Sequence, residues 1–168
     1  MKRNENLKSL SRDHHYGLLL GWKIRQGIRL HAGPGIMRQY VAYFATNSLF
    51  PHFEQEEQEV LVFLPAEDPQ KQKILADHDL IRSRVSEVLA AEGSEAQQLL
   101  ELEDLASRLD AHIRLEEREF FPYLERTLSP EILAKAGEAI RSGHTDYVEN
   151  FEHEFWERAA PDRSGHEN

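Results

Sequence analysis

One stretch of this chain occurs twice without a gap, and the repeat limits the fold more than any other feature. Residues 49–64 read LFPHFEQEEQEVLVFL, and residues 109–124 read LDAHIRLEEREFFPYL. A leucine, a histidine, a pair of glutamates, a further glutamate and a final leucine stand at the same places in both copies. Each copy is therefore predicted to form the same element and to carry the pattern His-x-x-x-Glu.

A second and shorter match lies upstream of each copy. Asp13-His14 corresponds to Asp77-His78, so an Asp-His pair precedes each His-x-x-x-Glu pattern at nearly the same distance. The chain is therefore predicted to contain two related helical hairpins. Each hairpin contributes an Asp-His pair on its first helix and a His-x-x-x-Glu pattern on its second helix.

Apolar residues recur at helical spacing through most of the chain, and no run alternates as a strand would. Glycine and proline mark the turns, as at Gly33-Pro34-Gly35. Pro51 predicts a kink inside the second helix, because proline has no N–H group for the hydrogen-bond ladder. The predicted helices span about 10–30, 34–64, 69–91 and 95–128, followed by a shorter helix from 129 and a last helix that ends near 156.

Helices joined by short turns pack as antiparallel neighbours, which predicts an all-α fold, an up-down-up-down four-helix bundle with additional short C-terminal helices. The length of 168 residues suits one domain. We expect a single domain over 1–168, with a bundle core at about 10–128 and a C-terminal helical extension at about 129–158.

Composition excludes several classes of protein. The chain has no cysteine, which rules out thiolate metal sites, disulfides and cysteine nucleophiles. A formal net charge of −10 disfavours binding to nucleic acid or to an anionic membrane surface. Residues 1–6 lack the apolar core of a secretory signal, and no apolar run is long enough to span a membrane. The expected location is the cytoplasm.

The two His-x-x-x-Glu patterns place ionisable side chains on apolar helix faces. Residues four apart lie on the same side of a helix, so His52 pairs with Glu56 and His112 pairs with Glu116. The flanking positions on these faces are apolar, which predicts that both pairs are buried. Burying an ionised glutamate is costly unless a cation compensates its charge. A bound metal would supply that charge.

The predicted metal ligands are four imidazoles and two carboxylates, from His14, His52, His78, His112, Glu56 and Glu116. If both glutamates bridge, each of two metals receives two nitrogens and two oxygens. That leaves room for a bridging oxide, hydroxide or water and for an open position. Such donors suit iron, and manganese or zinc also fit them. Some of the neighbouring carboxylates are expected to orient imidazole N–H groups, from the set Asp13, Glu57, Asp77 and Glu117.

The histidine on the first helix leaves an alternative open. His14 and His15 are adjacent and point about 100° apart on a helix, so only one of them faces the bundle interior. The repeat favours His14 as the ligand, and His15 is the alternative. The other histidines are predicted to lie at the surface or to cap helices: His31, His144, His153 and His166.

Taken in order, these motifs resemble the hemerythrin-like, HHE cation-binding family over about residues 10–128. The motifs are Asp-His at 13–14 and 77–78, His-x-x-x-Glu at 52–56, and His-x-x-x-Glu-Glu-x-x-x-Phe-Pro at 112–122. The resemblance implies a four-helix bundle with a non-haem di-iron centre, two irons per chain. It also implies small ligands such as dioxygen, peroxide or nitric oxide.

The chain departs from oxygen-carrying hemerythrin at two places. That family has a second histidine four residues after the one at 78, where this chain has Arg82, expected instead to pair with a glutamate. Its last motif has an aspartate five residues after the histidine, where this chain has Glu117. The single histidine resembles the iron-sensing hemerythrin-like domain of an animal F-box protein. These departures count against reversible oxygen carriage.

Two hypotheses of function follow. The first is a non-haem metal-binding protein with a di-iron centre, involved in oxygen or redox chemistry or in iron sensing, storage or scavenging. The alternative is a regulatory module whose folding or docking depends on metal loading. The sequence has no signature of a substrate pocket, which favours binding or sensing over catalysis. The exposed faces of residues 129–156 are the expected contact for a partner or for a homodimer.

Overall fold

The computed structural model describes residues 3–157, and these residues form helices without any strand. The α-helices are α1 (Lys8–Arg29), α2 (Pro34–Phe44), α3 (Phe50–Glu59), α4 (Pro69–Ala90), α5 (Glu95–Leu115), α6 (Phe121–Thr127) and α7 (Pro130–Gly143). Two π-helical turns, η2 (Ala45–Leu49) and η4 (Glu116–Phe120), join α2 to α3 and α5 to α6. Short 3₁₀ turns, η1 (Glu5–Leu7) and η3 (Leu61–Phe63), precede α1 and follow α3.

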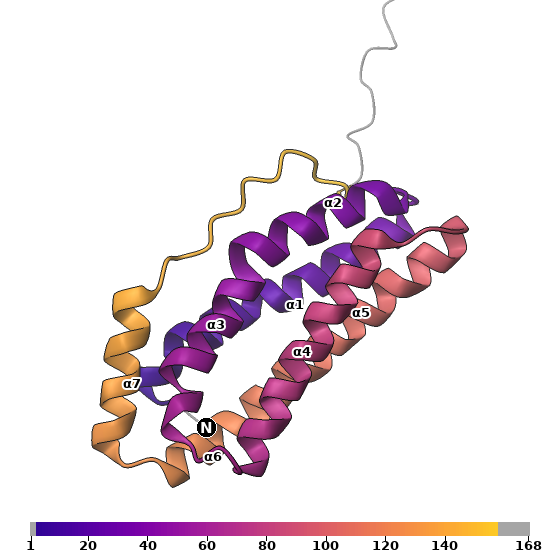
Figure 1. Ribbon diagram of the computed structural model, residues 1–168. Helices are drawn as coiled ribbons and strands as arrows, with labels where there is room; N and C mark the ends of the chain where they lie inside the picture. The colour runs from indigo at the N-terminus through magenta and orange to yellow at the C-terminus, as the bar shows by residue number, and fades with distance from the viewer. Residues whose placement is uncertain (1–2, 158–168) are drawn as a thin grey trace, which may run out of the picture.

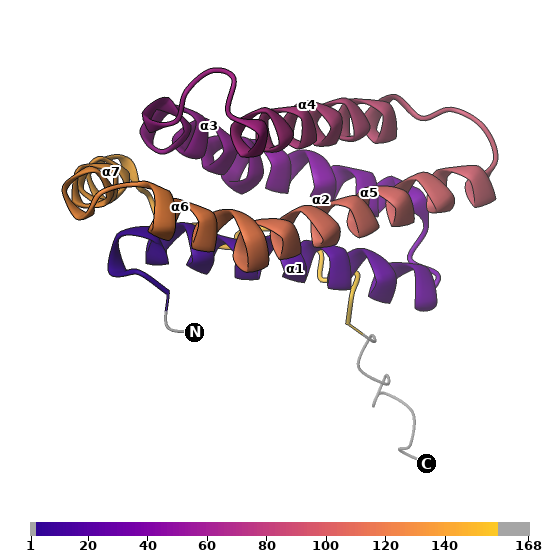
Figure 2. The ribbon, with the colours of Figure 1, turned by 90° about the horizontal axis from the view of Figure 1, so that it is seen from below.

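The long helical stretches lie side by side as a four-helix bundle (Figure 1). Each π-helical turn joins its two helices into one continuous arm. The four arms of the bundle are therefore α1, α2–α3, α4 and α5–α6. Helix α5 packs along both α1 and α4, and α2 packs against α4. Seen from below, α1 and α5–α6 form one layer, and α2–α3 and α4 form the other (Figure 2). The predicted fold class is confirmed.

Helix boundaries follow the local capping signals. Asp68 accepts hydrogen bonds from the backbone N–H groups of Gln70 and Lys71, and Pro69 occupies the first turn of α4. Ser94 caps α5 in the same way through the N–H of Gln97. These side chains satisfy donors that have no partner within the helix, which explains why both helices begin where the sequence predicts.

The irregularity predicted at Pro51 is present as a π-helical turn. Turn η2 ends two residues before Pro51, and turn η4 ends two residues before Pro122 in the other copy of the repeat. A proline cannot donate to the helical ladder, so the wider turn absorbs the lost bond and the arm continues. Both arms therefore carry their ligand residues beside an irregular turn.

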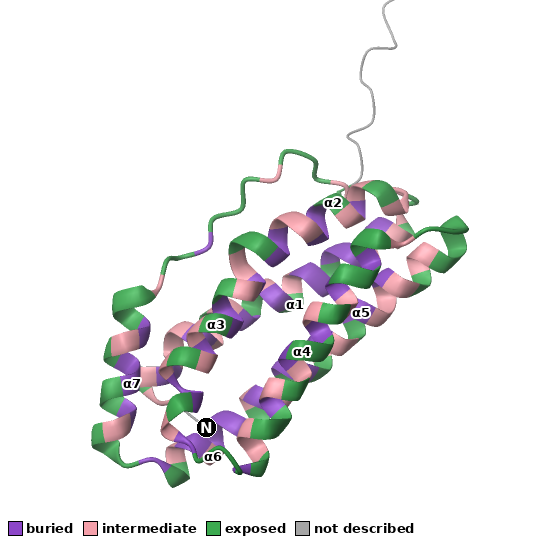
Figure 3. Ribbon diagram, in the orientation of Figure 1, coloured by how far each residue is buried: buried purple, intermediate pink, exposed green. Residues whose placement is uncertain are grey.

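The apolar core has two parts, with the histidines and glutamates between them. On α1, His14 lies between Leu10 of one cluster and Leu20 of the other. On α4, His78 likewise lies between Ile74 and Ile81. Buried residues face the inside of the bundle along every arm (Figure 3). The ionisable side chains are therefore enclosed by apolar packing from both ends.

The C-terminal extension differs from the prediction in one respect. Helix α7 packs against η1 and α3, but residues 144–157 form no helix, so the predicted last helix ending near Trp156 is wrong. This segment runs back along the bundle instead (Figure 1). Tyr43 Oη accepts a hydrogen bond from the N–H of Asn150, and Lys23 pairs with Glu149. Contacts with the bundle thus replace the backbone bonds that a helix would make.

Among residues 3–157, no helix combines the length and the apolar character that crossing a membrane requires.

Candidate metal centre

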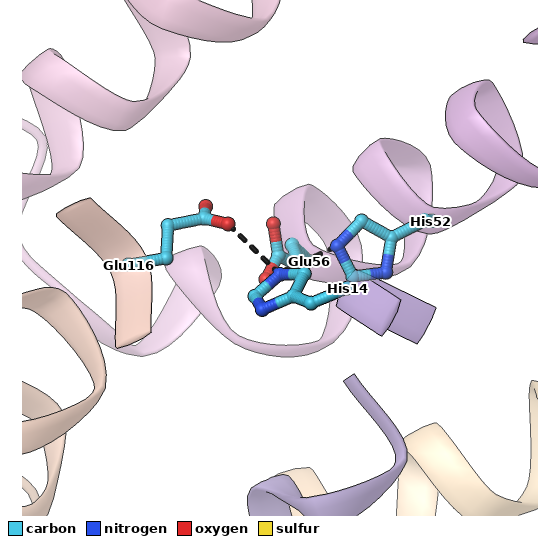
Figure 4. Close-up of side chains that lie close together, drawn as sticks. All are labelled: His14, His52, Glu56 and Glu116. Carbon is cyan, nitrogen blue, oxygen red and sulfur yellow. Dashed lines mark ion pairs between the residues drawn. The ribbon is translucent and has the colours of Figure 1, made fainter. Parts of the chain in front are cut away.

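Four histidines and two glutamates meet at the middle of the bundle, and they come from all four arms. Their ligand atoms form two groups, and the atoms within each group lie within 4.8 Å of one another. The first group is His14, His52, Glu56 and Glu116, and the second is Glu56, His78, His112 and Glu116. Figure 4 shows the first group, with side chains from separate helices turned toward one another. Both glutamates belong to both groups.

All six side chains are buried, and both glutamates have no exposed surface. The Nε2 atoms of the histidines face the carboxylates. His14 Nε2 lies 3.0 Å from Glu116 Oε2, and His112 Nε2 lies 3.3 Å from Glu116 Oε1. His78 Nε2 lies 3.3 Å from Glu56 Oε2, and His52 Nε2 lies 3.7 Å from Glu56 Oε1. Each imidazole therefore presents the same ring nitrogen to the centre.

The opposite ring nitrogens are held by carboxylates outside the centre. Nδ1 of His14 donates to Glu117 Oε1 at 2.7 Å, and Nδ1 of His78 donates to Glu57 Oε1 at 2.8 Å. A carboxylate can only accept, so the proton stays on Nδ1 and the lone pair of Nε2 points inward. This is the tautomer that a metal ligand requires.

The two aspartates of the repeat lie beside the other two histidines. Asp13 Oδ2 lies 3.4 Å from Nδ1 of His52, and Asp77 Oδ2 lies 3.6 Å from Nδ1 of His112. Asp13 therefore bonds to His52, whereas Nδ1 of His112 is buried without a hydrogen-bond partner and Asp77 only lies near it. Three of the four carboxylates thus orient imidazoles, in line with the prediction that some of them would.

The inner atoms of the site lack hydrogen-bond partners. Among the described residues, the Nε2 atoms of His14, His52, His78 and His112 and both carboxylate oxygens of Glu56 and Glu116 are buried and unpaired. The nitrogen–oxygen approaches between them do not have hydrogen-bond geometry. Each unsatisfied buried group costs about 1–3 kcal/mol, and more when it is charged. Because the unpaired atoms are all electron-pair donors of imidazole and carboxylate, the site fits bound cations.

Without a cation, protons balance part of the charge. Burial lowers the pKa of His14, but the adjacent carboxylates of Glu116 and Glu117 outweigh burial and raise the pKa to about 10. Burial likewise lowers the pKa of His78, and the nearby carboxylates of Glu116 and Glu56 raise it to about 10. The pKa of Glu116 lies well below its ordinary value, because the surrounding histidines outweigh its burial. Metal and protons therefore compete for the same atoms.

The structure separates the two adjacent histidines of α1. His14 is buried in the centre, whereas His15 is exposed and belongs to neither group. A step of about 100° along the helix turns the side chain of His15 away from the bundle interior. His31 and His153 are also exposed, and His166 lies outside the described residues.

Arg82 pairs with a glutamate, as predicted. Its guanidinium lies 2.9 Å from Glu57 Oε1, the same oxygen that accepts from Nδ1 of His78. It also lies over the ring of Phe53, 5.4 Å from the centroid. Arg82 therefore fixes the carboxylate that orients a histidine of the centre and contributes no ligand atom.

The sequence predicted His144 at the surface or at a helix cap, and it is the C-cap residue of α7, but its place beside the centre was not predicted. Its side chain is only 13% exposed, and Nδ1 lies 3.6 Å from Asp13 Oδ2. Nε2 lies 3.2 Å from Asp146 Oδ1. His144 follows the last helix and belongs to no repeated motif, so no local pattern in the sequence could have placed it beside the centre.

A four-helix bundle with two buried His–Glu groups that share their glutamates defines a class of helical metal-binding protein. Residues 6–124 match the family model of the hemerythrin HHE cation binding domain, and the chain belongs to this family. No curated protein and no solved structure matches the chain. The family match includes both groups of donors and ends before α7.

Proposed function

We propose that this protein binds two metal ions, most readily iron, and uses the pair to sense, store or scavenge oxygen-derived or related small oxidants. The observation that carries the proposal is the pair of buried donor groups with both glutamates in common. Two imidazoles and two carboxylates per metal leave coordination positions free. Such mixed nitrogen and oxygen ligation suits redox-active iron, and manganese or zinc fit the same donors.

In this assignment His14 and His52 would bind one metal, and His78 and His112 would bind the other. Glu56 and Glu116 belong to both groups and would contribute to both metals. Bound iron would supply redox chemistry and an open position for a small ligand. The residues of the chain hold the imidazoles in one tautomer and exclude bulk water: Phe53 stacks on the ring of His78 at 4.0 Å, and Phe121 on that of His14 at 5.4 Å.

Each of the two metals would receive the same number of histidine ligands. This supports sensing or redox handling over reversible oxygen carriage. Arg82 stands where oxygen-carrying hemerythrin has a further histidine, and its ion pair with Glu57 keeps it away from the centre. Neither metal would then receive a third imidazole.

A second candidate function is a regulatory module that responds to metal loading. It is favoured by the origin of the ligands, because every arm of the bundle contributes at least one of them. Loss of the metal would leave buried donors unpaired in all four arms at once. Metal binding and the packing of the bundle would then be coupled.

Elemental analysis of freshly purified protein, combined with an optical spectrum, tests the proposal. We expect two metal ions per chain and near-ultraviolet ligand-to-metal bands if the metal is iron. His112→Ala should lower the metal content substantially, whereas His153→Ala, which removes an exposed histidine, should leave it unchanged. Full metal occupancy in His112→Ala would refute the ligand assignment.

A further inference from the structure

A small internal cavity lies against one side of the donor groups. It has a volume of about 10 Å³, close to the smallest space that holds one water molecule. His14, His52, His112 and Glu116 line it, together with apolar side chains that include Phe44 and Ile113. A molecule in this cavity would be in contact with ligands of both proposed metals.

A larger chamber lies next to the cavity and opens to the surface. Its volume is about 500 Å³, and it shares Asp13, Ser48 and His52 with the cavity. Its inner wall comes from η2 and α3, and its outer wall comes from residues 143–148 and Asn150. The outer wall lies beyond the part of the chain that matches the family. Figure 1 shows this segment running alongside the arm formed by α2 and α3.

His144 lines the chamber and lies close to Asp13, which borders both spaces. Its Nδ1 atom lies 3.6 Å from Asp13 Oδ2 and 3.4 Å from Gln55 Oε1. The same oxygen of Asp13 lies 3.4 Å from Nδ1 of His52. Ser48 borders both spaces and lies in the π-helical turn. Asp13, Ser48 and His52 thus form the neck between the surface chamber and the centre, and His144 lies beside it.

The outer wall is anchored at defined points. Tyr43 Oη donates to the carbonyl of Val148 and accepts from the N–H of Asn150. One residue away, Glu149 pairs with the buried amine of Lys23 at 2.6 Å. These bonds hold the backbone of the segment over the α2–α3 arm, so the chamber is a built feature of the fold.

The lining favours small, uncharged molecules that form hydrogen bonds. Polar side chains surround the chamber: Asn47, Ser48, Gln55, His144, Thr145 and Asn150. The carboxylates of Asp13 and Asp146 give it a negative potential, and the net charge of −10 strengthens this. Anions are therefore slowed at the mouth relative to neutral molecules, and the small cavity favours ligands of only a few atoms.

We propose that this chamber is the route by which a small neutral oxidant of the peroxide class reaches the metal centre, with Ser48 at the neck and His144 beside it. The inference rests on the proposed function, because the metal pair is the destination. A competing opening exists between α4 and α5, a groove of about 420 Å³ that shares only His112 with the cavity. Lys73, Arg114 and Arg118 line that groove, so its lining is basic where that of the chamber is acidic.

The test compares two variants that each add a phenyl ring at one opening. Ser48→Phe fills the neck of the chamber, and Ala111→Phe narrows the groove between α4 and α5. Azide binding to the cobalt(II)-loaded protein is followed by stopped-flow absorption, which gives both association and dissociation rates. The reaction of the iron(II)-loaded protein with hydrogen peroxide is measured in parallel. Asn47→Trp at the chamber wall serves as a second obstruction if Ser48→Phe does not fold.

An obstruction in the route lowers the rates of ligand entry and ligand exit by the same factor. We expect Ser48→Phe to lower both azide rates and the peroxide rate by about tenfold or more, with the azide dissociation constant unchanged. Ala111→Phe should alter none of them. Asp146→Asn should raise the ratio of the azide rate to the peroxide rate, because it removes negative charge at the mouth.

Two outcomes overturn the inference. Unchanged rates in Ser48→Phe and Asn47→Trp at full cobalt loading would refute the chamber as the route and leave the metal site intact. Slower azide binding in Ala111→Phe alone would place the route in the groove. Separately, if the wild-type protein takes up neither cobalt nor iron, the proposed function itself fails, and the route fails with it.

Discussion

Glu117, from the second copy of the repeat, accepts a hydrogen bond at 2.7 Å from Nδ1 of His14, which belongs to the first hairpin. The reverse relation also holds, since Glu57 of the first copy accepts from Nδ1 of His78 in the second hairpin at 2.8 Å. Each hairpin therefore orients a histidine of the other. One hairpin alone could not hold its imidazoles in place, so the centre depends on the assembled bundle.

Glu117→Gln should weaken metal binding without removing a proposed ligand. The amide lacks the charge that stabilises the Nδ1 proton, and losses of about 10–100-fold are typical when such a partner is changed. Competition with a chromophoric chelator measures the affinity. Glu119→Gln changes an exposed glutamate two residues away and should have no effect. Equal affinity in the two variants would show that Glu117 does not orient His14.

Metal removal should lower the melting temperature. The buried donors lose their compensating charge, and protonation of His14 and His78, whose pKa values are raised to about 10, offsets only part of the loss. A loss of about 3 kcal/mol corresponds to a fall of about 10 °C for a chain of this size. Calorimetry with and without chelator gives the shift. The His112→Ala variant serves as the control, because chelator should hardly change its melting temperature.

Glu149→Gln should loosen the C-terminal segment by leaving the amine of Lys23 buried without its counter-charge. Lys23 is 4% exposed and also lies over the ring of Trp156, at 3.7 Å from the centroid. Glu149 is 31% exposed, so the loss should be about 1–2 kcal/mol, less than for a fully buried pair. Urea unfolding measures the loss, and the double variant with Lys23→Met should recover most of it. A double variant as unstable as Glu149→Gln would contradict this account.

The same ion pair gives the segment a dependence on pH. Burial raises the pKa of Glu149, but hydrogen bonds from Lys23 and Tyr40 outweigh burial and hold the pKa below its ordinary value. A carboxylate with a depressed pKa stabilises the fold above its unfolded pKa of about 4.3, and this contribution is lost as the pH falls through the folded pKa. Trp156 fluorescence in a Trp22→Phe background should therefore change on acidification, and Glu149→Gln should abolish this transition.

Gly27→Ala should destabilise the contact between α1 and the C-terminal segment. An added Cβ atom would lie 2.7 Å from Met37 Sδ and 2.8 Å from Phe155 Cδ2, closer than packed atoms tolerate. Overpacking of this kind costs about 1–3 kcal/mol. Gly35→Ala is the matched control, because its Cβ atom would meet nothing within 4 Å among the described residues. Chemical denaturation of both variants gives the difference, and equal stabilities would refute the close approach.

The sequence by itself determined the helices and the composition of the centre. Apolar periodicity, the caps at Asp68 and Ser94, and the repeated His-x-x-x-Glu pattern are local signals, because helical geometry links residues three or four positions apart. They sufficed to predict the bundle and the convergence of His52, Glu56, His112 and Glu116. They also predicted that some of the neighbouring carboxylates orient imidazoles, as Glu57 and Glu117 do.

Only the tertiary structure decided which side chains contact each other across different helices. The rotation of α1 in the bundle brings His14 inward and leaves His15 in solvent. The packing of the arms pairs Glu117 with His14 across the two hairpins. The path of residues 144–157 could not be predicted either, because the spacing of aromatic residues there resembles that of a helix. Contacts such as the ion pair of Lys23 with Glu149 hold the segment extended instead. Helix propensity depends on residues that are neighbours in the sequence. These contacts join positions more than a hundred residues apart, so the packing energy of the whole fold decides which of them form.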